Sequence, residues 1–214
     1  MSRWRLALVL LAGAGYAGLS HWMMLYHAGA PWAVVALLGP LWLTALGMAG
    51  SRFGPKGLAL VAVAGLAGFA LVLRGEAGDP NRLYVLQHVG INALLGGWFG
   101  GSLRGDRLSV IGGFAQRVHP LTPAMRLYTA AVTRVWALYF AVMVVASVTI
   151  YLALPFAIWS LFANMLTPLF VVALFLGEHL LRYRLHPEFE RTPLIEAIRA
   201  CIAPAPAPGR SIER

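Results

Sequence analysis

The dominant pattern along the chain is a series of long, continuous apolar stretches separated by short polar connections. A transmembrane helix needs about 20 apolar residues to cross roughly 30 Å of hydrocarbon, and these runs are too long and unbroken for the alternating strands of a membrane barrel. The pattern therefore predicts an all-α, polytopic integral membrane protein with about six transmembrane helices in a single domain, residues 1–186. The predicted helices cover residues 6–26, 31–50, 57–73, 83–103, 129–154 and 156–181.

Composition agrees with this pattern. Hydrophobic residues make up 59% of the 214 residues and charged residues only 12%, whereas a soluble domain carries about 25% charged residues. The net charge is +9, but the basic residues flank the apolar runs and form no nucleic-acid-binding motif, so nucleic acid is not an expected partner. The single cysteine, Cys201, excludes an intramolecular disulfide and a cysteine-built metal site.

The distribution of basic residues predicts the orientation. With a cytoplasmic N-terminus, 15 of the 17 Lys and Arg residues lie on the cytoplasmic side, and only Arg74 and Arg82 lie outside. Cytoplasmic segments carry such an excess, so we expect both termini in the cytoplasm of a multi-pass bacterial inner-membrane protein. The first segment also resembles a signal peptide, but its apolar character continues to Tyr26, which favours an uncleaved helix.

Two segments outside the predicted spans carry structural signals. Residues 104–126 mix arginines with apolar residues, which predicts either a short interfacial helix or re-entrant lip, or a solvated loop. In the cytoplasmic tail, residues 187–214, Thr192 before Pro193 predicts the start of a short amphipathic helix. The Ala and Pro residues at 203–208 predict an extended, disordered end.

Prolines inside the predicted spans predict local bends. Pro40 and Pro168 lie within apolar stretches, and each should kink its helix because proline removes a backbone donor. Thr167 could satisfy part of the backbone freed beside Pro168.

Polar residues inside the spans are costly and need partners. The predicted topology places five of them at similar depth in the outer half of the bundle, namely His21, Gln87, His88, Asn92 and Asn164. Three interpretations remain: hydrogen bonds between helices, a polar cavity for a headgroup, proton or small ligand, and axial ligation of a haem by His21 and His88. Two histidines do not form a haem motif, so no cofactor and no metal is predicted.

A second polar group is expected on the inner side. Arg134 lies near the cytoplasmic end of the fifth predicted helix, and Glu178 and His179 lie near that end of the sixth. Because these helices are joined by a very short turn, an Arg134–Glu178 pair could lock the hairpin or gate an inner opening. The alternative is that both side chains reach separately to the headgroups.

Several enzyme classes lack their signatures here. The only aspartates, Asp79 and Asp106, lie in loops, which excludes the magnesium-dependent enzymes that need clustered carboxylates. No H-E-x-x-H motif and no nucleotide-binding loop occurs. Whether the protein is an enzyme is uncertain, and the missing motifs favour a non-catalytic role.

Part of the chain carries a family resemblance. The residues concerned are Leu86-Gln87-His88-Val89-Gly90-Ile91-Asn92, Phe99-Gly100-Gly101-Ser102-Leu103, His119-Pro120-Leu121-Thr122-Pro123, Tyr128-Thr129, Val132-Thr133 and Trp136. This run resembles a family of small uncharacterised bacterial inner-membrane proteins, often encoded beside type II fatty-acid-like or aryl polyene biosynthesis genes. The resemblance implies a role near envelope lipid or polyene assembly. It implies that the functional residues are Gln87, His88, Asn92, His119, Thr122 and Arg134.

These observations lead to three functional hypotheses. The first is an accessory inner-membrane protein that handles a lipid-like product or docks acyl-carrier or acyltransferase proteins on its basic cytoplasmic face. The second is a small transporter or exporter subunit, which would need an oligomer or a broken helix to form a path. The third is a membrane redox or transferase enzyme that uses His21 and His88. A homo-oligomer is left open.

Overall fold

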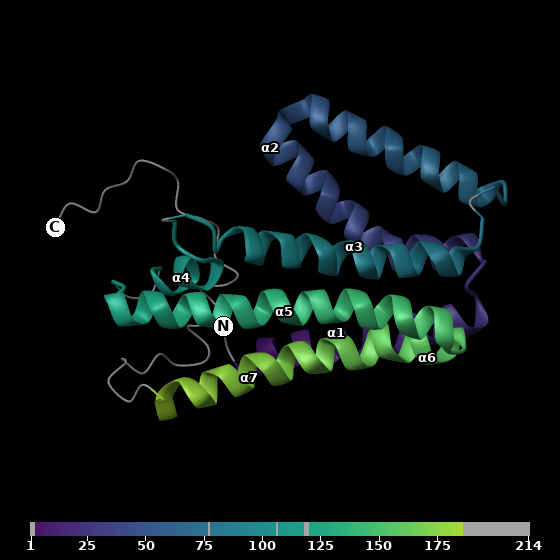
Figure 1. Ribbon diagram of the computed structural model, residues 1–214. Coiled ribbons are helices and arrows are strands. Elements are labelled where there is room, and N and C mark those ends of the chain that lie inside the picture. The colour runs from purple at the N-terminus through teal and green to yellow at the C-terminus, as the bar shows by residue number, and fades with distance from the viewer. Residues whose placement is uncertain (1–2, 77, 106, 118–119, 186–214) are drawn as a thin grey trace. The chain divides into compact units, whose positions relative to one another are not determined.

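The computed structural model describes residues 3–76, 78–105, 107–117 and 120–185, and the predicted tail helix and disordered end lie outside these residues. The described chain is all-α, as predicted, and contains seven α-helices and one π-helical segment (Figure 1). Their bounds are α1 Arg3–Tyr26, α2 Pro31–Leu73, α3 Pro80–Gly101, α4 Val110–Ala115, α5 Pro123–Ala153, α6 Phe156–Leu161, η1 Phe162–Leu166 and α7 Thr167–Leu185.

Three of the long helices begin with a proline. Pro31, Pro80 and Pro123 are the first residues of α2, α3 and α5, where the missing N–H has no helical partner to lose and the ring holds φ near its helical value. The hydroxyl of Thr122 accepts a hydrogen bond from the backbone N–H of Met125 at 3.3 Å. Thr122 therefore caps the start of α5.

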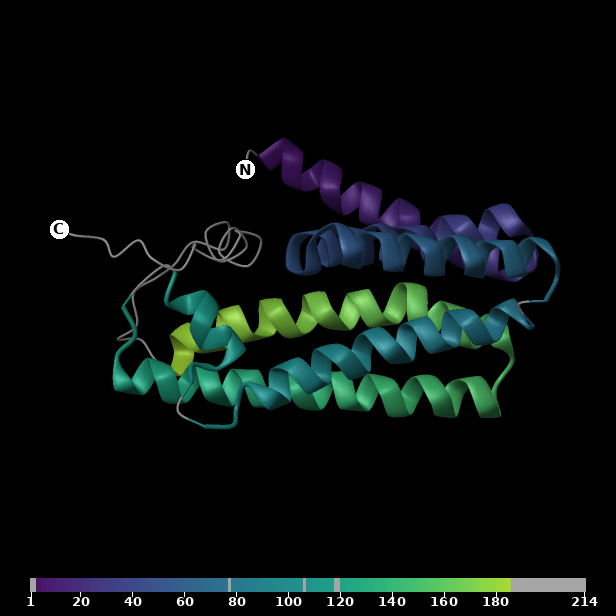
Figure 2. The ribbon, with the colours of Figure 1, turned by 90° about the horizontal axis from the view of Figure 1, so that it is seen from above.

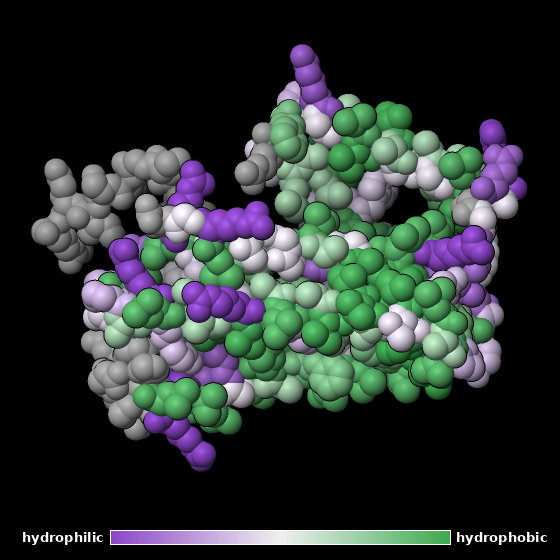
Figure 3. Space-filling view, viewed as in Figure 1, coloured by the Kyte–Doolittle hydropathy of each residue, from purple (hydrophilic) through white to green (hydrophobic). Residues whose placement is uncertain are grey.

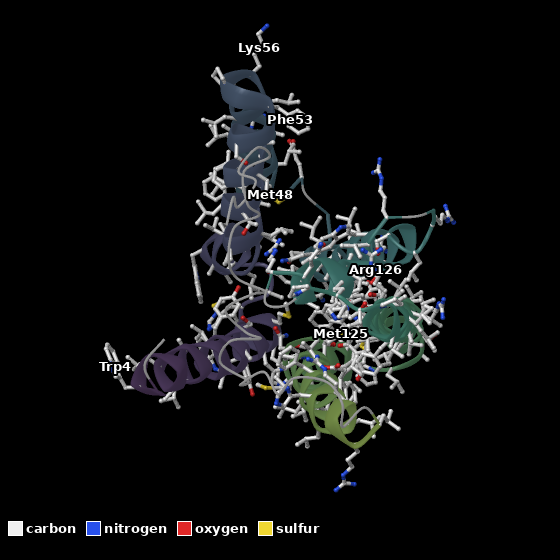
Figure 4. All side chains as sticks on the ribbon, turned by 90° about the vertical axis from the view of Figure 1, so that its left-hand side faces the viewer. Trp4, Met48, Phe53, Lys56, Met125 and Arg126 are labelled. Carbon is white, nitrogen blue, oxygen red and sulfur yellow. The ribbon has the colours of Figure 1, made fainter. Side chains whose placement is uncertain are left out.

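The second and third predicted spans form one helical element with an internal break. In α2 the backbone leaves helical angles at Gly54, with φ 65° and ψ −156°, and Pro55 follows. The helical geometry is therefore interrupted at Gly54, because glycine adopts such angles without strain. The two arms of α2 are Pro31–Ser51 and Phe53–Leu73, and Figure 4 shows Phe53 and Lys56 near the bend where these arms meet.

The two arms of α2 are joined by a tryptophan. The indole N–H of Trp42 on the first arm donates to the carbonyl oxygen of Val61 on the second, at 3.1 Å. A Cβ placed on Gly65 would overlap the Trp42 indole ring, so only glycine leaves room for the ring at this point. The arms are thereby held together as a hairpin.

The last predicted span is one helical run with a change of geometry in its middle. The π-helical turn η1 separates α6 from α7 just before Pro168. The hydroxyl of Thr167 donates to the carbonyl oxygen of Phe162, five residues earlier, at 3.0 Å. The same carbonyl already accepts the backbone N–H of Thr167, whereas the carbonyl that Pro168 leaves without a helical donor lies four or five residues before the proline. The bond that Thr167 makes is therefore not the one that its position beside Pro168 predicts.

The chain divides into two compact units, and the boundaries between the units fall within α3, α5 and α7. Unit 1 contains Leu95–Phe140 and the described residues from Val172 onward, and unit 2 contains Ala141–Val171 and the described residues up to Leu94. The core of unit 2 contains fully buried Trp159 and Tyr84, whose hydroxyl donates to the carbonyl oxygen of Ala28 at 3.0 Å.

Unit 1 holds the short helix α4 against neighbouring helices. The backbone N–H of Val110 donates to the Ser102 hydroxyl at 3.1 Å, and that of Ile111 contacts the Thr133 hydroxyl at 3.3 Å. Figure 1 and Figure 2 show α4 beside the N-terminal part of α5. The 104–126 connection therefore contains a helix that begins at buried Val110 and is not an irregular loop throughout.

Four helical stretches are long and apolar enough to cross a membrane: Pro31–Ser51, Phe53–Leu73, Pro123–Ala153 and Phe156–Arg182. Large apolar side chains cover much of the helix surface, and Figure 3 shows the extent of this apolar surface. Contiguous apolar patches of this extent are rare on soluble monomers, because the exposure of apolar surface to water is unfavourable. These features indicate a multi-pass membrane protein. α1 and α3 are not among the four stretches, so the six-span count stays a prediction.

Candidate functional site

The first polar centre of unit 2 is built around His88 of α3. Its Nδ1 lies 3.1 Å from the hydroxyl of Ser147 on α5, and its Nε2 lies 3.2 Å from the hydroxyl of Thr167 on α7. Trp159 and Phe162 present their rings to the imidazole at centroid distances of 6.0 and 5.7 Å. Both nitrogens of the ring are therefore engaged by hydroxyl groups, and aromatic rings flank it.

The hydrogen bonds around His88 run in one direction. The indole N–H of Trp159 donates to the Ser147 hydroxyl at 3.0 Å, which leaves the proton of Ser147 for Nδ1 of His88. The proton of Thr167 goes to the carbonyl of Phe162, so the Thr167 oxygen accepts from Nε2. A neutral imidazole in this setting carries its proton on Nε2.

The second polar centre of unit 2 joins α1 to α6 and η1. Nδ1 of His21 lies 2.9 Å from the hydroxyl of the fully buried Ser160. The amide nitrogen of Asn164 donates to the Ser160 carbonyl at 2.9 Å and to the Met24 sulfur at 3.2 Å. Buried Ser20, next to His21 in sequence, has no hydrogen-bond partner for its hydroxyl among the described residues.

Adjacent residues of α6 serve the two centres. Trp159 contacts the His88 centre and Ser160 the His21 centre, and both side chains are fully buried. α6 begins directly after Pro155, which sets the start of the helix. The short turn at Pro155 thereby positions both residues relative to the end of α5.

The five residues predicted for the outer cluster do not form one network. His21 and Asn164 meet through Ser160. Asn92 is buried and donates to the backbone carbonyl of His88 on its own helix, at 2.8 Å. The half-buried side chain of Gln87 makes no hydrogen bond to either centre among the described residues. The polar residues therefore divide between two centres.

Sequence reasoning did not find the hydroxyl partners. Ser147, Ser160 and Trp159 lie in apolar stretches, where a single serine or tryptophan is common and carries no motif. Their burial and their distance to a histidine distinguish them, and both properties depend on how the helices pack. Thr167 was predicted only as a partner for the backbone beside Pro168, and its contact with His88 likewise depends on helix packing.

The expected Arg134–Glu178 pair is not the one that forms in unit 1. Glu178 accepts two hydrogen bonds from Arg182, one helical turn later, at 2.9 and 2.7 Å. It also accepts from the hydroxyl of Tyr128 on α5 at 3.0 Å, whereas the Arg134 side chain is exposed. The i, i+4 spacing on one helix brings Arg182 within reach of Glu178 without any helix packing. His179 is half-buried beside them in sequence.

The two loop candidates contribute differently. Thr122 acts as a helix cap through its hydroxyl, which accounts for its residue type without any ligand. His119 lies outside the described residues.

Aromatic rings gather where α1 ends and α2 begins. The ring of His27 lies between Trp22 and Trp32, with centroid distances of 4.8 and 5.2 Å. Both tryptophans are exposed, as is the neighbouring Tyr26. Trp and Tyr rings are enriched where a membrane helix meets the headgroup region, so the junction between α1 and α2 fits an interfacial position.

The described part of the chain holds no group of three or more His, Cys, Asp or Glu side chains able to bind a metal ion. Axial ligation by His88 would require a ring nitrogen, and both nitrogens contact hydroxyl groups. The arrangement is suited to hydrogen bonding and to orienting a polar group.

Comparisons of the chain with protein families, with curated proteins and with solved structures find no match.

Proposed function

We propose that the chain is a six-helix inner-membrane protein with both termini in the cytoplasm, in which α1 and α3 cross the bilayer with the four apolar stretches. The apolar exterior supports this membrane location. The excess of basic residues in the connections assigned to the cytoplasm supports the orientation.

Cysteine labelling tests the topology. In a Cys201→Ser background, single cysteines replace Asp79, in the connection between α2 and α3, and Gln116, directly after α4. A membrane-impermeant maleimide applied to spheroplasts should label the cysteine at 79 and should label the one at 116 only after permeabilisation. The reverse pattern would contradict the proposed orientation.

Within that topology, the protein acts as an accessory component that handles a lipid-like product of envelope lipid or polyene synthesis. The observation that carries this proposal is the His21 centre, where a half-buried imidazole and the amide of Asn164 lie among apolar helices. An amphiphile needs hydrogen-bonding groups for its polar end and apolar surface for its chain. Unit 2 offers both, and the buried Ser20 hydroxyl adds a polar atom beside the centre.

The cytoplasmic side of the same proposal concerns partners. The segment 104–126 carries four arginines and one aspartate, and acidic acyl-carrier proteins would be attracted to such a charge distribution. A pull-down from membranes at low salt should recover an acyl-carrier or acyltransferase protein. Recovery of neither would remove docking from the proposal.

Lipid profiling tests the function. A deletion strain should show an altered envelope lipid or polyene profile that the wild-type gene restores. Asn164→Leu, which keeps the side-chain size but removes the amide, should restore less than the control Ser51→Ala, whose exposed hydroxyl bonds only to its own helix. An unchanged profile in the deletion strain would remove the proposal.

A transporter or exporter subunit is the second candidate. The π-helical turn η1 within the run α6–η1–α7, with Asn164 in the turn and Thr167 directly after it, favours it, because π-helical turns inside α-helices occur frequently at functional sites. Measurement of the export of the labelled lipid or polyene product from cells distinguishes a transporter from an accessory component. A deletion strain that makes and exports the product at the normal rate would exclude the transporter.

A further inference from the structure

Arg134 occupies an unusual position on α5. Its side chain is exposed, and Leu127 and Leu138, which share its helix face by the i, i+7 and i+11 spacing, are 75% and 65% exposed. A guanidinium group therefore lies on a face that is otherwise apolar. In a membrane protein such a face meets lipid, where an unneutralised charge is costly.

The length of α5 sets the depth of Arg134. The helix has 31 residues, or about 46 Å, which exceeds the roughly 30 Å of the hydrocarbon core. The two-residue turn between Ala153 and Phe156 places the C-terminal end of α5 at one membrane surface. Arg134 is 19 residues before Ala153, or about 28 Å, which puts it at the opposite boundary between hydrocarbon and headgroups.

The described carboxylate of unit 1 does not neutralise Arg134. Glu178 is bound by Arg182 through two hydrogen bonds and by the Tyr128 hydroxyl. A second exposed arginine, Arg126, lies eight residues earlier on α5, about 12 Å further toward the cytoplasm in the proposed topology. Residues 101–153 carry five arginines and one aspartate. The charge at this boundary is therefore positive, and an anionic group would neutralise it.

We infer that Arg134, with Arg126 behind it, binds the phosphate of an anionic phospholipid of the inner leaflet. A guanidinium group binds phosphate oxygens through two parallel hydrogen bonds. The exposed leucines beside Arg134 contact the acyl chains of the same molecule, which a soluble anion lacks. The inference rests on the proposed topology, because that topology assigns the N-terminal end of α5 to the inner leaflet.

Lipid titration of the full-length protein in detergent tests the inference. Fluorescent phosphatidylglycerol should bind more tightly than phosphatidylcholine. Arg134→Gln should weaken phosphatidylglycerol binding about fivefold, the effect expected of one basic residue at an anionic membrane surface. The affinity of the Arg134→Lys protein for phosphatidylglycerol should lie between those of the wild type and Arg134→Gln, since lysine keeps the charge but loses the paired hydrogen bonds. Arg74→Gln is the matched control, an exposed arginine just beyond α2, and should leave binding unchanged.

Several results would overturn the inference. Equal losses in Arg134→Gln and Arg74→Gln would indicate a general charge effect, and full competition by inorganic phosphate would indicate a site for a free anion. An acidic acyl-carrier protein that binds only when Arg134 is present, with phosphatidylglycerol binding unchanged, would assign this face to a protein. If Arg134→Gln leaves phosphatidylglycerol binding unchanged while the cysteines at positions 79 and 116 are labelled as expected, only the lipid site is contradicted. A reversed labelling pattern would contradict the topology itself.

Discussion

Ser147 is the residue on which the His88 centre depends. Its hydroxyl accepts from the indole of Trp159 on α6 and contacts Nδ1 of His88 on α3, so one small side chain of α5 joins two other helices. The side chain is fully buried, and water cannot replace these hydrogen bonds. The network orients the imidazole through groups that lie far apart in the sequence.

Replacing Ser147 with alanine leaves the Trp159 N–H and Nδ1 of His88 without partners. We expect the free energy of unfolding to fall by about 1 kcal/mol, within the range measured for hydrogen bonds between membrane helices. Thermal unfolding in detergent measures the change, with Ser51→Ala as the control because its exposed hydroxyl bonds to Met48 of its own helix. Equal midpoints for the two variants would argue against the network.

The partner of Glu178 can be tested at the same scale. A double-mutant cycle with Glu178→Gln and Arg182→Gln should give a coupling energy of about 0.5 kcal/mol, since the pair is partly exposed and within one helix. The cycle of Glu178→Gln with Arg134→Gln should give a coupling energy near zero. A larger coupling to Arg134 than to Arg182 would restore the pair expected from the sequence.

At the scale of the element, α2 illustrates how one helix becomes a hairpin. Gly54 takes a backbone conformation that other residues avoid, and Trp42 then reaches the second arm to bond with Val61. The Trp42 ring lies over Gly65, where no side chain fits. The break and the close approach therefore depend on two glycines with different roles: conformational freedom at Gly54 and space at Gly65.

Gly65→Ala should push the Trp42 ring away and break its hydrogen bond to Val61. We expect a loss of about 1–3 kcal/mol in the free energy of unfolding, as for other over-packed contacts. Gly68→Ala is the matched control on the same arm, because a Cβ there meets no atom within 4 Å. Thermal unfolding of both variants in detergent decides the point, and an unaffected Gly65→Ala protein would mean that the arms do not pack in this way.

At the scale of the whole molecule, the apolar exterior is the decisive property. Four stretches are long enough to cross a bilayer, and Phe53–Leu73 buries none of its most apolar part. Because burial within the protein does not cover these surfaces, the hydrocarbon of a membrane has to cover them.

Membrane retention follows from this property. Alkaline carbonate washing should leave the full chain in the membrane pellet, and detergent should release it. The comparison protein is a peripheral membrane protein from the same preparation, which carbonate should strip. Release of this chain by carbonate would contradict integral membrane insertion.

Much of the helical architecture follows from the sequence alone. Long apolar runs are a local property of the chain, so the approximate positions of α1, α3, α5 and the run α6–η1–α7 could be predicted, whereas α4 was left open between a helix and a loop. The second and third predicted spans correspond to the two helical arms of α2, Pro31–Ser51 and Phe53–Leu73, which meet at the non-helical residue Gly54. The predicted start of α5 is late, because hydropathy marks only the apolar part of a helix that already begins at Pro123.

Only the tertiary structure decided which polar side chains meet. Hydropathy placed His21, His88 and Asn164 in apolar helices, but the rotation of each helix about its axis determines which neighbour a side chain reaches. Ser147 and Ser160 became partners of the two histidines through that packing, while Glu178 took Arg182 from its own helix. Helix formation is governed by nearby residues, whereas partner choice depends on contacts between residues far apart in the sequence.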